Sequence, residues 1–155
     1  MPFTVEPANS VDAHEIAKLL HRSIIELCTD DHAGDPGRYE PWLDNKTAEN
    51  VETWISGTGK CFTAIDENRK VLGVALGRLD GHVLLIYVLP EARFTGVSKA
   101  LIRALESCLQ DRGLDDIHVK STATAKRFFR SLGYSETGET DVQNYMTFHT
   151  FKKAI

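Results

Sequence analysis

The chain lacks the marks of several protein classes. It contains no apolar run near the ~20 residues that a helix needs to span a bilayer. Its first residues do not place a basic stretch before an apolar one, as a signal peptide does. We therefore expect no membrane segment and a cytoplasmic location.

Cysteine is also scarce, and the three that occur, Cys28, Cys61 and Cys108, are far apart and odd in number. This usage is typical of free thiols in a reducing compartment. No Cys-x-x-Cys occurs, and the six histidines show no metal-ligand spacing. We predict neither a disulfide framework nor a bound metal.

Basic residues are too few for a nucleic-acid surface. Lysine and arginine number 18 against 22 acidic residues, which gives a net charge of −4. Proteins that bind phosphate backbones carry the opposite balance. A nucleotide-binding protein is a weak alternative, because neither Gly-x-x-x-x-Gly-Lys-Ser/Thr nor Gly-x-Gly-x-x-Gly is present. The 155 residues, 42% of them hydrophobic, predict a single globular domain over 1–155.

The most informative stretch that is present runs from Val83 to Leu101. It begins as an apolar run, breaks at Pro90 and restarts as a helix near Thr95. The first amides of such a helix have no backbone acceptor, and the helix dipole favours an anion there. Gly96 would let the backbone approach that anion, and Ser98 would add a hydroxyl donor. The stretch predicts an anion site, with a plain strand-to-helix corner as the alternative.

Hydrophobic periodicity predicts a mixed α/β sheet with helices on its faces. The strand over 83–88, the helix after it and the strand over 116–120 form a crossover unit, so those two strands should be parallel. The predicted strands are 3–6, 61–65, 70–79, 82–88, 116–120, 134–137 and 142–150, and the predicted helices are about 10–28, 47–57, 95–110 and 122–132.

The segment from Thr29 to Trp42 is rich in Asp, Gly and Pro and is predicted to be a loop with short turns. Loops of this length in compact domains are often functional. The alternative is a solvated connector in which Tyr39 and Trp42 pin the loop to the core.

Three local features together resemble the GNAT superfamily of acyl-CoA-dependent N-acetyltransferases. Residues 86–91, Ile-Tyr-Val-Leu-Pro-Glu, are similar to the family's fourth strand and its exit. Residues 93–98, Arg-Phe-Thr-Gly-Val-Ser, resemble its pyrophosphate motif Gln/Arg-x-x-Gly-x-Gly/Ala except at the last place. Residues 125–134 resemble its Ala-x-x-apolar-Tyr-x-x-x-Gly-Phe/Tyr ending. The resemblance covers the whole chain and implies a mostly antiparallel sheet of about seven strands.

The resemblance implies acetyl-CoA, or another acyl-CoA, as co-substrate. The acceptor would be a primary amine of a small molecule or peptide. The family's fourth and fifth strands splay apart, often at a bulge in the fourth, and the pantetheine arm lies in the gap. A homodimer through a strand edge is also implied. The residues implied to bind coenzyme are Ile86, Tyr87, Val88, Arg93, Phe94, Thr95, Gly96, Val97, Ser98, Lys99, Thr122 and Phe129.

Departures from the family pattern affect the catalytic half of the implied site. Phe129 stands where many members have a tyrosine that protonates the departing thiolate, and a phenylalanine cannot donate a proton. A water, or the hydroxyl of Tyr87, Tyr134 or Tyr145, would have to replace it. The other interpretation is a non-catalytic module that binds or senses acyl-CoA. Thr122 also stands where the family often has a cofactor-binding asparagine.

Two histidines are candidates for the base that removes the amine's proton. His82 stands near the position of a glutamate that some members use, although it also fits a strand-end histidine beside a turn. His32 is a rival. Asp31, His32 and Trp42 are implied to lie near the acceptor, where an acidic residue would attract a cationic amine. A covalent route through Cys28 has no supporting motif, so direct attack by the amine is the simpler mechanism.

Overall fold

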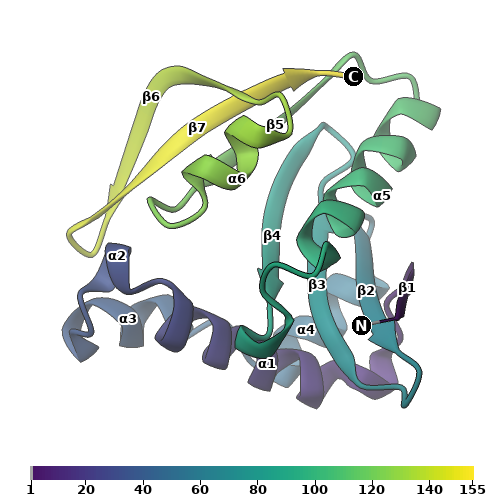
Figure 1. The fold of residues 1–155 in the computed structure, drawn as a ribbon, viewed down its shortest axis with the longest axis horizontal. Coiled ribbons are helices and arrows are strands. Elements are labelled where there is room, and N and C mark those ends of the chain that lie inside the picture. The colour runs from purple at the N-terminus through teal and green to yellow at the C-terminus, as the bar shows by residue number, and fades with distance from the viewer. Residues whose placement is uncertain (1) are drawn as a thin grey trace.

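The computed structural model describes residues 2–155 as a seven-stranded sheet with helices on both faces (Figure 1). The strand order is β1-β2-β3-β4-β5-β7-β6, so the predicted α/β class is confirmed. The strands are β1 (Phe3–Pro7), β2 (Lys60–Asp66), β3 (Val71–Gly77), β4 (His82–Val88), β5 (Asp116–Ser121), β6 (Ser135–Gln143) and β7 (Met146–Ala154). The helices are α1 (Ala13–Leu27), α2 (Thr29–His32), α3 (Pro36–Leu43), α4 (Ala48–Ser56), α5 (Val97–Asp111) and α6 (Lys126–Ser131).

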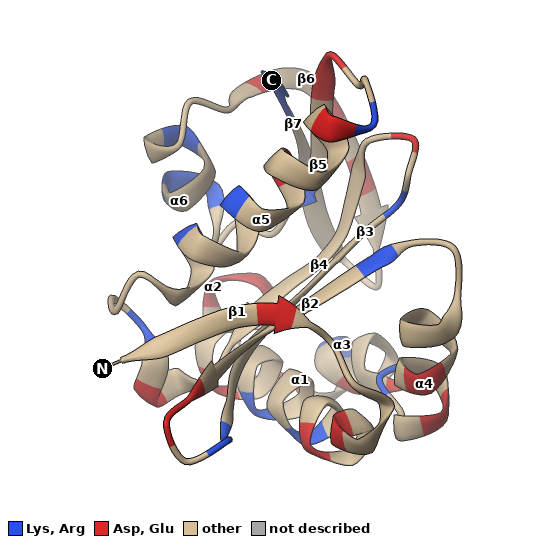
Figure 2. Ribbon diagram, turned by 90° about the vertical axis from the view of Figure 1, so that its right-hand side faces the viewer, with Lys and Arg blue, Asp and Glu red and all other residues tan. Residues whose placement is uncertain are grey.

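Two amphipathic helices make the main layers of the core. Helix α1 packs on β3 and β4, and α5 packs on the opposite face, as the edge-on view shows (Figure 2). Strand β3 admits α5 closely because it carries glycine. A Cβ on Gly73 would lie 2.9 Å from side-chain atoms of Val97 and Leu101, and one on Gly77 would lie 3.0 Å from Leu105. Close approach of α5 fixes where its N-terminus meets the sheet.

Strands β4 and β5 are parallel, as predicted, but they pair over a short length. Only His82–His118 and Val83–Val119 are in register, and the strands separate beyond them. On its other side β4 pairs Leu85 with Leu76 and Val83 with Gly77 of β3, which leaves Leu84 as the extra residue of a bulge. The bulge and the short pairing open the middle of the sheet toward the C-terminal end of β4.

Three segment boundaries differ from the sequence prediction. The expected loop over 29–42 is largely α2 and α3. Helix α3 begins with Pro36, and its N-cap Asp35 accepts a hydrogen bond from the amide of Gly37. The final hairpin turns at Asn144 and Tyr145, which have φ of 49° and 66°, and not at residues 138–139. The helix expected over 122–132 is the shorter α6.

Within residues 2–155, no helix is both long and apolar enough to cross a membrane. No group of three or more potential metal-ligating side chains is found in the same range.

Candidate functional site

A cavity of about 750 Å³ lies where β4 separates from β5. Its walls come from α1, the second half of β4, the turn into α5, the turn after β5, and α6. The lining residues are Ser23, Leu27, Cys28, Ile86, Tyr87, Val88, Ala92, Arg93, Phe94, Gly96, Val97, Ser98, Lys99, Thr122, Thr124, Ala125, Arg127, Phe128, Ser131 and Leu132. Ten of the twelve residues predicted to bind coenzyme are among these, and of the other two, Thr95 lies within the lining turn.

The turn into α5 presents a row of unpaired backbone donors. Within residues 2–155, the amides from Phe94 to Lys99 have no hydrogen-bond acceptor, and the next amide, that of Ala100, donates to the carbonyl of Gly96. Six consecutive free amides at a helix N-terminus form a site for an anionic oxygen. We call residues 94–99 the amide cradle.

Gly96 permits the shape of the amide cradle. Its φ is +86°, which L-residues with a side chain rarely adopt, and a Cβ placed there would meet no atom within 4 Å. The glycine is therefore required by backbone conformation and leaves open space in front of the amides. The hydroxyl of Thr95 donates to the carbonyl of Ala92 at 2.5 Å and secures the turn. The amide cradle thus leaves room for a bulky anion such as a pyrophosphate.

Charge around the cavity favours an anionic ligand. Three cationic side chains line it, those of Arg93, Lys99 and Arg127, and among the described residues no carboxylate does. The guanidinium of Arg93 lies 4.7 Å from the ring centroid of Phe94, which is 93% exposed. Figure 2 shows basic residues on α6 and acidic residues on α4, while α1 and α5 carry charges of both signs.

Phe129, which was predicted to bind coenzyme, does not lie in the cavity wall that α6 forms. The Phe129 side chain is 1% exposed and packs against Tyr134 and Phe151 in the core, so it does not line the cavity. Its neighbour Phe128 lines the cavity instead. Thr122 does line the cavity, but its hydroxyl accepts a hydrogen bond from the amide of Ala125 at 3.1 Å and so helps to start α6.

Tyr134 is tied to a buried carboxylate and not to the cavity. Its hydroxyl donates to Glu106 at 2.8 Å, and the Nζ of Lys153 donates to the same oxygen at 2.9 Å. Burial, together with the bond to Glu106, raises the pKa of Tyr134. The prediction of Tyr134 as a catalytic hydroxyl is therefore corrected to a structural role.

Tyr87 and Cys28 both line the cavity, and burial affects the pKa of each side chain. Burial raises the pKa of Tyr87, and the nearby Cys28 and Asp31 act in the same direction. Burial also raises the pKa of the Cys28 thiol to about 12. At neutral pH the phenol keeps its proton available for donation, and the thiol is a poor nucleophile because it is not a thiolate.

Asp31 and His32, predicted to contact the acceptor, instead make hydrogen bonds within the protein. The Asp31 carboxylate accepts hydrogen bonds from the amides of Ala123 and Thr124 at 2.6 and 3.2 Å. His32 is fully buried. Its Nε2 lies 2.7 Å from the carbonyl of Ile24, and its Nδ1 accepts from the amide of Gly34 at 3.0 Å. Both ring nitrogens are occupied, so His32 is not available as a base.

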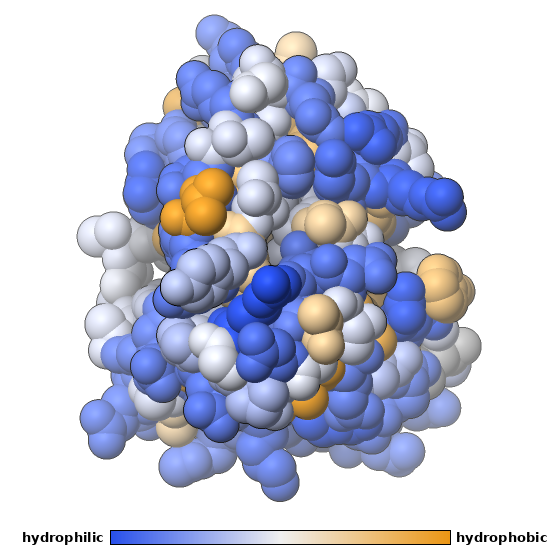
Figure 3. All heavy atoms as spheres, turned by 90° about the vertical axis from the view of Figure 1, so that its left-hand side faces the viewer, coloured by the Kyte–Doolittle hydropathy of each residue, from blue (hydrophilic) through white to orange (hydrophobic). Residues whose placement is uncertain are grey.

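Trp42 connects α3 to the last strand. Its ring meets Phe148 of β7 edge-to-face with centroids 5.7 Å apart, and it also contacts His32 at 6.3 Å. The structure brings the three predicted acceptor residues into one cluster, but none of them lines the cavity. The side of the molecule bearing α2, α3 and the β6–β7 hairpin shows a mostly hydrophilic surface with isolated apolar residues (Figure 3).

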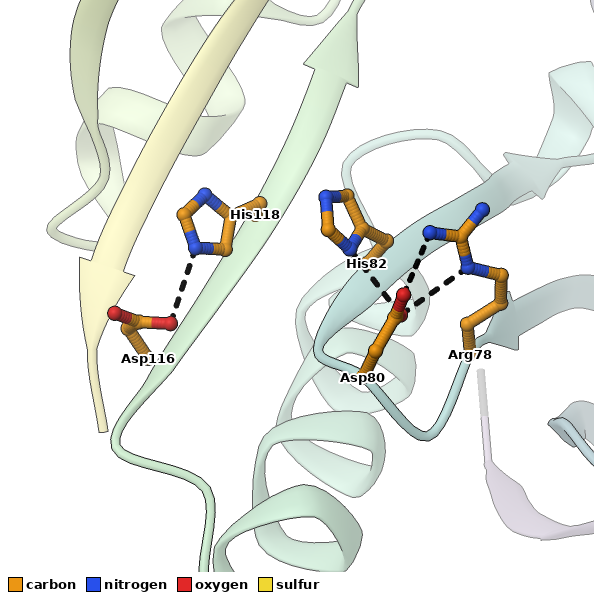
Figure 4. Close-up of polar contacts among 5 residues, drawn as sticks. All are labelled: Arg78, Asp80, His82, Asp116 and His118. Carbon is orange, nitrogen blue, oxygen red and sulfur yellow. Dashed lines mark hydrogen bonds and ion pairs between the residues drawn. The ribbon is translucent and has the colours of Figure 1, made fainter.

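His82 lies at the start of β4, at the vertex of the gap and outside the cavity lining. Its Nδ1 lies 3.2 Å from Oδ1 of Asp80, and Arg78 donates to both oxygens of that carboxylate at 3.1 and 2.6 Å (Figure 4). The Arg78 bond, followed by that of His82, holds the pKa of Asp80 well below its usual range. The carboxylate is therefore an anion that fixes the His82 ring and leaves Nε2 toward solvent.

The sequence prediction missed ten lining residues: Ser23, Leu27, Cys28, Ala92, Thr124, Ala125, Arg127, Phe128, Ser131 and Leu132. The first three lie at the C-terminal end of α1, where helical periodicity predicts core residues. Which of them borders a cavity depends on how far α1 extends over the splayed strands. The motif at 125–134 could have identified Arg127 and Phe128 only if the rotation of α6 were known.

Comparisons with known proteins agree with this geometry. Residues 16–155 match the family model described as an acetyltransferase (GNAT) domain. Acetyltransferase ECA0875 of Pectobacterium atrosepticum is 32% identical over 82 residues, which are 51% of this chain, and the chain spans 57% of that relative's length.

Two solved structures show the same fold over nearly the whole chain. A GCN5-related N-acetyltransferase from Rhodopseudomonas palustris has a TM-score of 0.88 at 24% identity, covering 100% of this chain and 97% of the other. The PaiA N-acetyltransferase from Thermoplasma acidophilum, solved in complex with coenzyme A, has a TM-score of 0.82 at 14% identity over 100% of both chains.

Proposed function

Because the chain belongs to the GNAT acetyltransferase family, we propose that it transfers an acetyl or other acyl group from acyl-CoA to a primary amine. The observation that carries the proposal is the amide cradle, six free backbone donors at the mouth of a cavity between splayed strands. The acceptor would be an amine of a small molecule or a peptide.

The residues present fit a coenzyme with a pyrophosphate. The amide cradle would hold the phosphate oxygens, with Ser98 adding its hydroxyl and Lys99 and Arg127 adding positive charge. The β5-facing edge of β4 lacks a strand partner beyond Val83, so backbone groups of Ile86 and Val88 on that edge would pair with the amides of the pantetheine arm.

The bound coenzyme supplies the acyl group as a thioester. The chain's own residues then have three tasks. Free backbone amides on the open edge of β4 polarise the carbonyl. His82, oriented by Asp80, takes a proton from the acceptor ammonium through water along the exposed face. Tyr87, protonated in the cavity wall, donates a proton to the departing sulfur.

The amine attacks the thioester directly in this proposal. Cys28 is the one cysteine in the cavity lining, and its raised pKa keeps the thiol protonated. A covalent acyl-cysteine would need the thiolate. The acceptor enters from the side bearing α2, α3 and the β6–β7 hairpin, whose hydrophilic surface suits a polar amine (Figure 3). A cytoplasmic location and a homodimer through the edge strands β1 or β6 stay predictions.

A two-part experiment tests the proposal. Calorimetry with CoA measures whether the cavity binds the coenzyme. Thiol release from acetyl-CoA is then followed with a panel of small amines and of peptides bearing free N-termini or lysines. We expect binding and turnover on at least one amine. If the protein binds neither CoA nor acetyl-CoA, the proposed acyl transfer from acyl-CoA is wrong.

A non-catalytic acyl-CoA-binding module is the second candidate. It is favoured by the burial of Phe129 at the family's tyrosine position and by the capture of the Tyr134 hydroxyl by Glu106. Tight CoA binding without turnover on any amine of the panel would support this candidate over the enzyme.

A further inference from the structure

Two aspartate–histidine pairs lie side by side where β4 meets β5 (Figure 4). His82 contacts Asp80 at 3.2 Å, and Nε2 of His118 contacts Oδ1 of Asp116 at 3.0 Å. The two imidazoles are stacked, with centroids 5.2 Å apart and planes 18° apart. Each aspartate has a cation of its own, Arg78 at 2.6 Å for Asp80 and, at 3.4 Å, a lysine on β7 for Asp116.

Backbone pairing dictates the stacking. His82 and His118 are partners in the two-residue register that joins β4 to β5, so their side chains emerge on the same face of the sheet. The next pair, Val83 and Val119, points to the other face and is buried. The histidine side chains stay 45% and 28% exposed, so protons can reach them from solvent.

The carboxylates determine which ring nitrogens are free. The Arg78 bond, followed by that of His82, lowers the pKa of Asp80, and the bond from His118, followed by that of Lys152, lowers the pKa of Asp116. An anionic carboxylate only accepts hydrogen bonds, so each ring nitrogen that faces one carries a hydrogen. Nε2 of His82 and Nδ1 of His118 are therefore the atoms that can accept a proton.

The stacked rings cannot both hold an extra proton at little cost, because two positive charges 5.2 Å apart repel. Arg78 and Lys152 partly neutralise the aspartates that would otherwise compensate the second charge. These five groups are the charged and titratable neighbours of His82 at this seam: Arg78 and Asp80 before β4, Asp116 and His118 on β5, and Lys152 on β7.

We propose that His82 and His118 act as one proton-accepting unit for the acceptor amine, in which His118 is the positioning residue. The ammonium gives one proton, through water, to Nε2 of His82 and becomes a neutral nucleophile. The His82 imidazolium is held by Asp80 until the proton passes to solvent. His118 fixes the ring plane of His82 and opposes a second protonation of the pair. This inference rests on the proposed role of His82 as base.

Two replacements separate the effects of ring and charge. His118→Ala removes the stacked ring, and we expect kcat to fall several-fold with little change in KM for acetyl-CoA. His118→Phe keeps a flat ring and loses the charge. We expect it to recover most of kcat, because a flat ring at this position still stacks against His82 and holds its ring plane. His14→Phe, at an exposed site on α1, is the control and should change neither quantity.

NMR of the histidine side chains in the ligand-free protein gives a readout independent of catalysis. We expect His118→Ala to change the ring signals of His82, because the stacked ring is lost, and His118→Phe to change them less. His82 ring signals that stay unchanged in His118→Ala overturn the shared unit. Changed signals combined with unchanged kcat in His82→Phe keep the stacked pair but overturn its catalytic use, and with it the base assigned under the proposed function.

Discussion

The Asp31 carboxylate accepts a hydrogen bond from the hydroxyl of Thr124 at 2.6 Å, although 93 residues separate the two. The amide of Ala123 donates to the other carboxylate oxygen at 2.6 Å, and Asp31 is 8% exposed. This contact, the Asp31 clasp, joins α2 to the turn before α6. Thr124 lines the cavity, so the clasp holds one wall in place.

Replacing Asp31 with Asn should weaken the clasp, because an amide nitrogen cannot accept the bonds that a carboxylate oxygen accepts. We expect the free energy of unfolding in urea to fall by about 1–3 kcal/mol. The Kd for CoA should rise a few-fold as the Thr124 wall loosens. Asp30→Asn is the matched control, since Asp30 is adjacent and exposed. Equal effects of the two replacements would contradict the structural role of Asp31.

Gly96 and Gly113 form a matched pair at the two ends of α5. Both have φ of +86°, and a Cβ on either would meet no atom within 4 Å. Alanine at either position should lower the free energy of unfolding by about 1 kcal/mol, because of the left-handed backbone. Aspartate at 96 should also raise the Kd for CoA at least tenfold by setting a negative charge before the amide cradle. If calorimetry shows that Gly96→Asp and Gly113→Asp bind CoA equally well, the anion site does not lie at the amide cradle.

Tyr87 and Tyr134 should respond differently to loss of the hydroxyl. Tyr134→Phe leaves Glu106 with one fewer donor, so we expect about 1–3 kcal/mol less stability and an unchanged kcat. Tyr87→Phe removes the hydroxyl in the cavity wall, and kcat should fall tenfold or more if it protonates the departing sulfur. Steady-state kinetics beside urea unfolding separates the two. A loss of kcat in Tyr134→Phe alone would restore its catalytic role.

Lys46 offers a test through pH. Burial lowers its pKa to about 8, and the side chain is 7% exposed with its Nζ donating to Asn45 at 2.6 Å. Below pH 8 the folded protein must hold a charge that the unfolded chain hydrates freely, so this lysine lowers stability there and the penalty fades as pH rises toward 10.5. Lys46→Met should therefore raise the free energy of unfolding by about 2 kcal/mol at pH 7.

That gain should shrink as pH rises from 8 to 10.5. Lys60→Met, at an exposed lysine on β2, is the control and should show no such pH dependence. Urea unfolding of both variants at several pH values is the measurement. A pH-independent gain in Lys46→Met would mean that added hydrophobic contact, and not the buried charge, sets the effect.

Much of the fold could be predicted from sequence because its signals are local. The helical spacing of Leu101, Leu105 and Leu109 identifies the buried face of α5. Glycine at the helix start and a preceding break at Pro90 identify the turn that carries the amide cradle. Backbone donors depend on chain conformation and little on distant packing, so the free amides of the cradle follow from the same local signals.

The side-chain half of the site depends on tertiary contacts that no local pattern encodes. A rotation of α6 by one residue decides whether Phe128 or Phe129 faces the cavity. His32 seemed available because its bonds to Ile24 and Gly34 form only in the turns that lead from α1 into α2 and out of α2 again, which the sequence prediction treated as one loop. The last hairpin shifted because Gly138, with φ of 92°, sits in an irregular stretch of β6 and not in the turn.

The short pairing between β4 and β5 affects how easily the sheet can bend. Two residue pairs join the four-stranded part of the sheet to the three-stranded part, so we expect this joint to bend more easily than the rest of the sheet. The angle between the two parts is then set by whatever spans the gap away from the joint. In this chain the Asp31 clasp spans the gap away from that joint, together with the contact between Trp42 and Phe148, so we expect these two contacts to set the width of the cavity.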